Sequence, residues 1–192
     1  MPTERFVFTS HDGHELAARL DLPRGPVLAT ALFAHCFTCS KDTPAARRIA
    51  ARLAGAGIAV LRFDFTGLGH SNGEFENTSF TGNAEDLVKA ASTLEARGMA
   101  PGLLIGHSLG GAAVLAAAGR IDSVRAVVTI GAPFDPTHVT RHFAGALGRI
   151  EADGAAEVDI GGRPVPIGKG FVRPLSAQPP ARPTAPPPPP VP

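Results

Sequence analysis

Apolar residues follow two kinds of pattern along the first 150 residues of the chain. Some form short, nearly continuous runs, which are typical of strands buried on both faces of a sheet. Others recur at the three- and four-residue spacing of one helix face. The expected strands are residues 4–10, 15–22, 27–34, 58–65, 102–106 and 124–133. The expected helices are residues 43–57, 81–97, 109–120 and 135–148, with a small hairpin at 157–167.

The order of these elements predicts the fold class. Two strands joined by an Asp-Gly turn signal come first, and strands and helices then alternate. Such alternation is typical of an α/β fold with a mostly parallel, doubly wound sheet and helices on both faces. Twelve of the 19 prolines lie at or after Pro164, and the last residues show no apolar periodicity. We therefore expect one folded domain at residues 1–173 and a disordered, Pro-rich tail at residues 174–192.

The net charge of the chain limits the kinds of macromolecule that it is expected to bind. The chain has 18 basic and 17 acidic side chains, a formal net charge of +1, and so lacks the strong positive field that holds nucleic acid or an anionic membrane. No apolar run approaches the roughly 20 residues of a membrane span. The N-terminal segment does not have the pattern of a secretory signal. We expect a cytoplasmic protein with no nucleic-acid partner and no membrane partner.

One motif carries chemistry. Gly106-His107-Ser108-Leu109-Gly110 has the form G-x-S-x-G and lies between an expected strand and an expected helix. The turn between them is so sharp that the neighbours of the serine must be small, which the glycines satisfy. Ser108 would then sit in a strained conformation at a helix N-terminus, where developing negative charge is stabilised.

Three segments, in their order and spacing, resemble the α/β-hydrolase family. Residues 34–38 (AHCFT) follow the third expected strand, where the family has its oxyanion loop. Residues 64–71 (DFTGLGHS) are similar to the D-x-x-G-x-G-x-S loop of the family, and residues 106–110 form the elbow. The resemblance covers about residues 4–150 and implies strands one to six of an eight-stranded plan. The segment HCFTCSKD resembles a bacterial subgroup in which the hydrolase module is often fused to an OsmC-like peroxide-reducing domain.

The resemblance implies a function and the residues that perform it. It implies a serine hydrolase of esters, thioesters or small amides, acting on a small-molecule acyl substrate with no cofactor and no metal. Ser108 would be the nucleophile, and the backbone N–H groups of Leu109 and Phe37 would form the oxyanion hole. Gly106, His107 and Gly110 would shape the elbow without taking part in the chemistry.

The catalytic acid and base of the family are not found where the resemblance places them. The family has them after its seventh and eighth strands, but the strands expected here stop at the sixth and no histidine follows His142. The alternative is therefore a truncated, catalytically impaired remnant that retains at most ligand binding. Asp135 and His138 could form a substitute acid–base pair, although an Asp N-cap followed by two surface or lid histidines is the simpler interpretation. A metal bound by His138 and His142 would need a third ligand that we cannot identify.

Two further features invite interpretation. Cys36 and Cys39 form a C-x-x-C motif before a helix, which suggests redox chemistry, but two thiols lining a cleft is the interpretation we favour. The sixth expected strand, VRAVVTI, would leave an open apolar edge, so self-association through that edge is expected unless it is covered.

Overall fold

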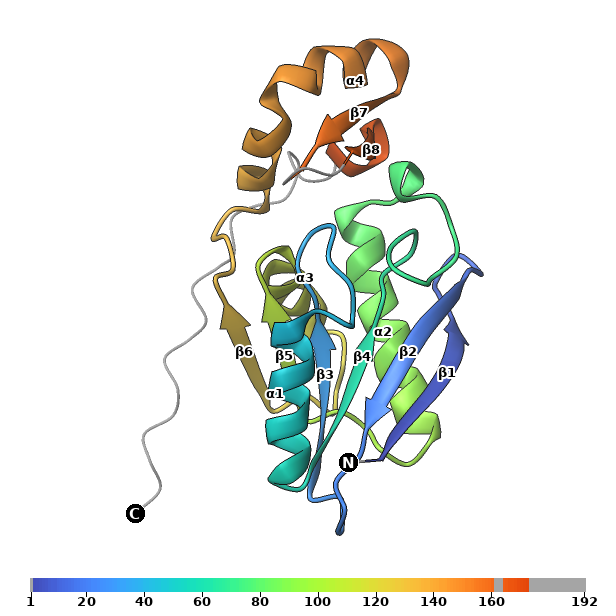
Figure 1. Cartoon of the computed structure of the whole chain (residues 1–192), viewed down its shortest axis with the longest axis vertical. Helices are drawn as coiled ribbons and strands as arrows, with labels where there is room; N and C mark the ends of the chain where they lie inside the picture. The colour runs from blue at the N-terminus through green and yellow to red at the C-terminus, as the bar shows by residue number, and fades with distance from the viewer. Residues whose placement is uncertain (1, 161–163, 173–192) are drawn as a thin grey trace.

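A six-stranded sheet forms the body of the protein. The computed structural model describes residues 2–160 and 164–172, except for the side chains of residues 136–139 and 142. The strands are β1 (Thr3–Thr9), β2 (Glu15–Asp21), β3 (Ala29–Ala34), β4 (Ile58–Phe63), β5 (Leu103–His107) and β6 (Ala126–Ile130). Their spatial order is β1-β2-β4-β3-β5-β6 (Figure 1). β1 and β2 run antiparallel to their neighbours and the other four strands are parallel, which confirms the expected fold class.

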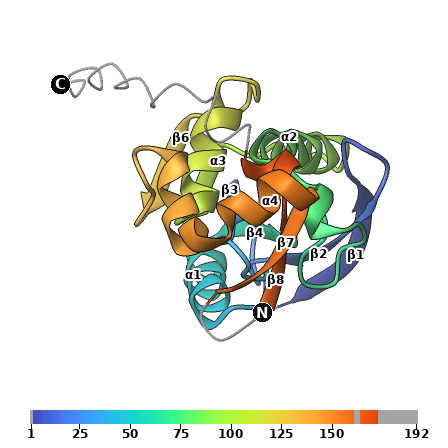
Figure 2. The ribbon, with the colours of Figure 1, turned by 90° about the horizontal axis from the view of Figure 1, so that it is seen from above.

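Helices cover both faces of this sheet. Helix α1 (Pro44–Gly55) lies on one face, and α2 (Phe80–Ala96) and α3 (Leu109–Ala118) lie on the opposite face (Figure 2). Ala46, Ala50 and Ala54 form the buried stripe of α1 at the four-residue spacing of one helix face. The small residues of α3 allow it to approach the sheet closely. Ser79 caps the N-terminus of α2, and its hydroxyl accepts a hydrogen bond from the Gly82 N–H.

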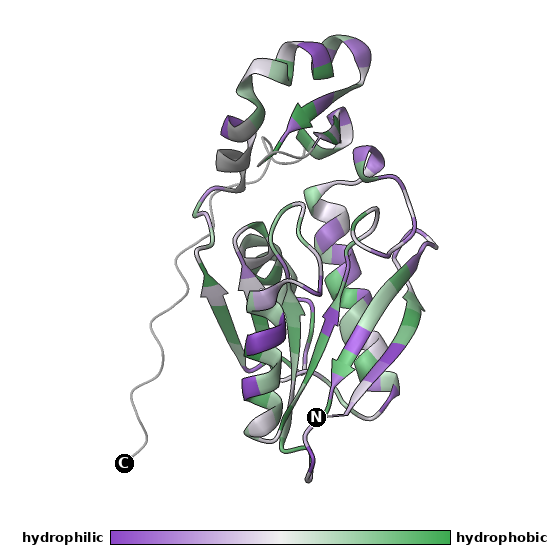
Figure 3. Cartoon of the chain, in the orientation of Figure 1, coloured by the Kyte–Doolittle hydropathy of each residue, from purple (hydrophilic) through white to green (hydrophobic). Residues whose placement is uncertain are grey.

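The two faces have separate cores of unequal size. The larger cluster lies between the sheet and α2 and α3, and the smaller one lies between the sheet and α1. Hydrophobic residues accordingly concentrate on the strands (Figure 3). Val128 and Ile130 of β6 remain 46% and 38% exposed, so the outer strand is less well covered than its neighbours. Within the described part of the chain, no helix is both long and apolar enough to cross a membrane.

A cap lies beyond the carboxyl ends of the parallel strands (Figure 1). Its elements are η2 (Pro136–Ala146), α4 (Leu147–Asp153), β7 (Ala155–Asp159) and β8 (Pro164–Gly168). β7 and β8 pair as an antiparallel hairpin, close to the expected 157–167. β8 packs on the short helix η1 (Phe75–Asn77). Phe143 of η2 and Phe171, which follows β8 and is counted with the cap, are buried in the larger cluster, so the cap is packed onto the body of the protein.

The cap also contains the main departure from the expected elements. The single helix expected at 135–148 is wrong: η2 has 3₁₀ geometry with a kink at Phe143 (φ −136°, ψ 27°), and α4 follows as a separate helix. The kink lies where Phe143 packs against Phe37, so a tertiary contact overrides the helical pattern. The Pro-rich tail expected at 174–192 lies outside the described residues.

Candidate functional site

Ser108 lies in the sharp turn between β5 and α3, at the carboxyl end of a central parallel strand. Its backbone has φ 54° and ψ −122°, a conformation that is costly for any residue with a Cβ. The Ser108 N–H donates a 2.8 Å hydrogen bond to the carbonyl oxygen of Ile130 on β6. The neighbouring strand therefore helps to hold the turn, and the backbone has the strained form that the motif predicts.

The glycines on either side of Ser108 are required for space. A Cβ added to Gly106 would lie 2.5 Å from the Gly111 Cα, and one added to Gly110 would lie 2.6 Å from the Ala34 carbonyl oxygen. Both distances are far below van der Waals contact. Any larger side chain would therefore push α3 away from β3 and β5.

The loop after β3 lies against the turn that contains Ser108. It contains a tight turn closed by a 3.0 Å hydrogen bond from the Cys39 N–H to the Cys36 carbonyl oxygen. The Phe37 N–H is not used in that bond. Leu109 is the first residue of α3, and the N–H groups of a first helical turn have no partner within the helix. Phe37 and Leu109 line the same cavity, so the structure places these two residues at one site.

That cavity is narrow and mostly apolar. Its lining consists of His35, Cys36, Phe37, Phe65, Leu68, Phe75, Asn83, Leu109, Gly110 and Ala113. Its volume is about 10 Å³, enough for about one water molecule. The Phe37 ring packs on Phe75 and Phe171 at centroid distances of 5.6 and 5.1 Å, so aromatic contacts hold this side of the cavity together.

Phenylalanine side chains form part of the cavity wall. Phe37, Phe65 and Phe75 line the cavity, and Phe143 packs on Phe37. Phe134 is instead 69% exposed, because it lies in the connection between β6 and η2 and not under the cap.

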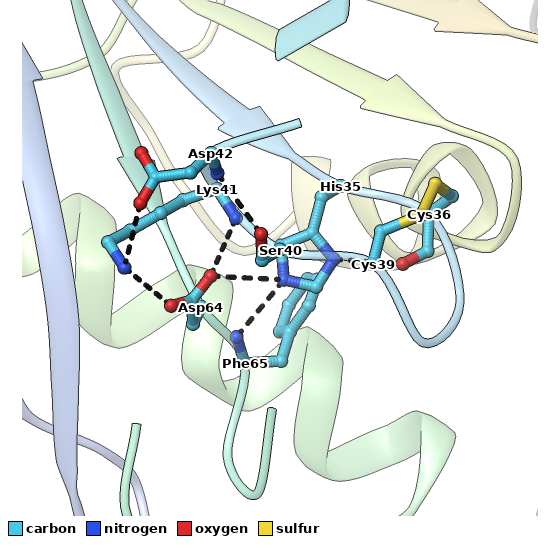
Figure 4. The surroundings of a disulfide bond; sticks show 8 residues. All are labelled: His35, Cys36, Cys39, Ser40, Lys41, Asp42, Asp64 and Phe65. Carbon is cyan, nitrogen blue, oxygen red and sulfur yellow. Dashed lines mark hydrogen bonds and ion pairs between the residues drawn. A yellow bond between two sulfur atoms is a disulfide. The ribbon is translucent and has the colours of Figure 1, made fainter. Parts of the chain in front are cut away.

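Cys36 and Cys39 form a disulfide bond (Figure 4). The expectation of two free thiols lining a cleft is therefore wrong, although Cys36 does line the cavity. The bond spans Phe37 and Thr38, and Thr38 has φ 57°, which is unusual for a β-branched residue. The loop that contains Phe37 is thus covalently closed.

His35 fixes the beginning of this loop. Its Nδ1 donates to the Cys36 carbonyl oxygen at 2.8 Å, and its Nε2 accepts from the Phe65 N–H at 3.4 Å. Burial lowers the pKa of His35 below 6.5, and this outweighs the opposing effects of the Cys36 carbonyl and of Asp64. His35 is therefore a neutral structural residue at pH 7.

A buried ion pair fixes the end of the loop. Asp64 Oδ1 accepts from the Lys41 N–H and Asp64 Oδ2 accepts from Lys41 Nζ, both at 2.6 Å (Figure 4). The His70 N–H donates to the same carboxylate at 2.9 Å. Burial raises the pKa of Asp64, but the hydrogen bonds from Lys41 and His70 together hold it below its ordinary value. Asp64 therefore organises the loops after β3 and β4.

The role of Lys41 was not predicted. The only signal was its place in HCFTCSKD, because its partner lies 23 positions away in the sequence. Arg62 extends the network: it donates to Asp21 at 2.7 Å and also to the Lys41 carbonyl oxygen. The loop is thereby tied to both β2 and β4.

Among the described residues, the side chain of Ser108 has no hydrogen bond to its own helix or to a titratable group. His107 ends β5 and lies opposite Ile130 in the strand ladder. Asp135 is exposed before η2, and the side chain of His138 lies outside the described residues. Within the described ranges, no side chain is hydrogen-bonded to Ser108 Oγ, and no group of three His, Cys, Asp or Glu residues could hold a metal ion.

Comparisons with known proteins agree on one family. The model of the serine aminopeptidase S33 family matches residues 33–161. The esterase domain of a Rhodothermus marinus protein is 48% identical, with a TM-score of 0.67, over 92% of this chain and 69% of that domain. No curated protein sequence gives a significant match.

More distant structures share the fold alone. Alpha/beta hydrolase domain-containing protein 10 from mouse is 22% identical, with a TM-score of 0.69, over 91% of this chain and 70% of that one. Est1E from Butyrivibrio proteoclasticus, solved with ferulic acid bound, is 22% identical with a TM-score of 0.70, over 90% of this chain and 71% of that one.

Proposed function

The chain belongs to the serine aminopeptidase S33 family of α/β hydrolases, and we propose that it hydrolyses small carboxylic esters through an acyl-enzyme at Ser108. The observation that carries the proposal is the backbone of Ser108, which has positive φ at the first turn of α3. The Rhodothermus marinus relative, described as an esterase domain, favours an ester over the peptide bond that the family name suggests.

The chemistry proceeds in two steps. Ser108 Oγ attacks the acyl carbonyl carbon, and the alcohol leaves as the acyl-enzyme forms. The negative charge on the carbonyl oxygen is stabilised by the N–H groups of Leu109 and Phe37, which are fixed before the substrate binds. Water then attacks the acyl carbon and releases the acid. The glycines at 106 and 110 keep α3 close enough for this geometry.

Both steps need a group that takes the Ser108 Oγ proton. Asp135 and His138, at the start of the cap, are the candidates that the chain offers. The competing function is binding of an acyl ligand without turnover. It is favoured by the finding that, in the described part of the chain, Ser108 Oγ has no hydrogen-bonded base.

A serine-directed fluorophosphonate probe and a p-nitrophenyl ester separate these functions. We expect wild-type protein to be labelled and to release p-nitrophenol, and Ser108→Ala to do neither. The matched control is Ser92→Ala, which removes an exposed hydroxyl from α2 and should leave both signals unchanged. Turnover that persists in Ser108→Ala would contradict the proposal. A wild-type protein that is neither labelled nor active, but binds the acid product, would establish the competing function.

The substitute base has its own test. If His138 accepts the proton, His138→Gln should reduce ester turnover by at least about a hundredfold without changing the fold. His142→Gln, four positions along the same segment, is the matched control. Equal effects of the two substitutions would argue against a specific role for His138.

A further inference from the structure

We propose that Cys36–Cys39 is a thiol–disulfide exchange site, and that its reduction by a dithiol withdraws the Phe37 N–H from the cavity beside Ser108. The coupling to ester turnover rests on the proposed function, whereas the exchange itself does not. The observation that carries the proposal is a disulfide bond that spans two residues, Phe37 and Thr38, and whose Cys36 lines the same cavity as Phe37 and Leu109.

The bond lies in a partly exposed turn. Cys36 and Cys39 are both partly exposed, unlike the buried His35 and Lys41 that flank them. Cys36 also borders the cavity that contains Leu109. A dithiol approaching from solvent therefore meets the bond without unfolding of the sheet.

Thr38 supplies the reason for movement. Thr38 and Ser108 are the two non-glycine residues with positive φ in the described part of the chain. Such a conformation persists only where the surroundings enforce it. Around Thr38 the enforcing elements are the disulfide bond and the turn hydrogen bond from the Cys39 N–H to the Cys36 carbonyl oxygen. Without the covalent bond, Thr38 can return to negative φ, which turns the Phe37–Thr38 peptide and shifts Phe37, together with its N–H, relative to the cavity.

The movement is confined to this turn. On one side His35 is held through the Phe65 N–H, and on the other Lys41 is held by Asp64. Neither anchor involves a sulfur atom, as Figure 4 shows. Reduction therefore loosens the few residues between two fixed points and leaves β3 and α1 in place.

The ring of Phe37 carries the change further. It packs on Phe75 of η1, and on Phe143 and Phe171 of the cap. Movement of the Cys36–Cys39 turn that rotates Phe37 therefore disturbs the aromatic wall of the cavity as well as the Phe37 N–H.

Reduction of the disulfide bond takes two exchange steps. A thiolate of the reductant attacks one sulfur of the bond, and the other sulfur leaves as a thiolate that takes a proton. The second thiol of the reductant then displaces the protein sulfur from the mixed disulfide. The protein gains two electrons and two protons as the Cys36 and Cys39 thiols, and the reductant becomes a disulfide.

The test uses the full chain, with dithiothreitol as the dithiol. Alkylation followed by intact mass measurement should add no label to the oxidised chain and two labels to the reduced chain, because these are the only two cysteines in the sequence. Reduction should lower kcat for a p-nitrophenyl ester by at least about tenfold, since removal of one whole oxyanion donor costs about a hundredfold or more. Cys36→Ser/Cys39→Ser should have the low activity and ignore dithiothreitol.

A rescue variant shows whether the effect of reduction comes from backbone strain at Thr38 or only from loss of the Cys36–Cys39 cross-link. Thr38→Gly makes positive φ acceptable, so in this variant the ratio of oxidised to reduced activity should fall from about ten to below about three. An unchanged ratio would overturn the strain argument. Full turnover in a chain that carries two labels would overturn the coupling, and absence of label after reduction would overturn the exchange.

Failure of the proposed function gives a different result. In that case the oxidised chain shows no Ser108-dependent turnover, but the mass shift still reports exchange. Amide hydrogen exchange at residues 36–40 should then still become faster on reduction while β3 stays protected. Protection that does not change would overturn the proposal without reference to activity.

Discussion

Two glycines flank Ser108 because there is no room for a side chain. Gly110 has no positive φ, so any L-residue could adopt its backbone conformation. What excludes other residues is the backbone of β3 and the loop after it: the carbonyl oxygens of Ala34 and His35 lie against the position that a Cβ would occupy. The two glycines therefore allow α3 to lie close to the sheet. Within the motif, Ser108 is the residue whose backbone conformation is strained.

Replacing Gly110 with alanine tests this. We expect Gly110→Ala to lower the free energy of unfolding by about 1–3 kcal/mol, because backbone atoms on both sides must move. Gly119→Ala is the matched control at the other end of α3, where an added Cβ meets nothing within 4 Å. It should change stability by no more than about 0.5 kcal/mol. Urea unfolding measures both, and equal losses would contradict the argument from space.

His35 makes stability depend on pH. Its folded pKa is lowered from 6.5 by burial, so the unfolded chain takes up a proton more readily than the folded chain. The stability from neutral His35 is fully present above pH 6.5 and is lost as the pH falls below it toward the folded pKa. His35→Gln should remove this slope, whereas His14→Gln, at a half-exposed histidine, should keep it. Urea unfolding at several pH values checks this, and a slope that survives in His35→Gln would contradict it.

At the scale of elements, the strands and the first three helices could be predicted from apolar pattern alone. The β5–Ser108–α3 turn could also be predicted, because its residues are adjacent in the sequence. The ion pair of Lys41 and Asp64 could not, since the partners lie 23 positions apart and meet only when β3 and β4 pair. The kink at Phe143 was missed for the same reason, because it depends on packing against Phe37.

The Lys41–Asp64 pair should be essential to the loop that it closes. Lys41→Met leaves a buried carboxylate without its partner, so we expect a loss of about 3–5 kcal/mol in the free energy of unfolding. Lys41→Met/Asp64→Asn should lose less, because no unpaired charge remains buried. Lys89→Met, at an exposed lysine of α2, should be close to neutral. If the double variant is as unstable as Lys41→Met alone, the buried charge is not the cause.

At the scale of the whole molecule, the two edges of the sheet differ. β1 contains Glu4 and Arg5, and charges on an edge strand discourage pairing with another chain. β6, AVVTI, has no charge and no proline. Val128 pairs with Ile105 of β5 and so shares the sheet face that α1 covers, but the core on that face does not extend to β6. The apolar surface of this face thus continues beyond the helix that shields it.

We therefore expect this chain to self-associate through β6, with a second copy as the partner. A two-fold axis would pair β6 with its own copy and bring the exposed Val128 and Ile130 side chains of both chains together. Val128→Lys places like charges across that axis and should shift the chain to monomer in sedimentation velocity at every concentration tested. Val7→Lys is the matched control, because Val7 is 56% exposed on the opposite edge strand, and it should leave the association unchanged. A wild-type chain that is monomeric throughout, or a Val7→Lys variant that dissociates equally, would exclude β6 as the contact.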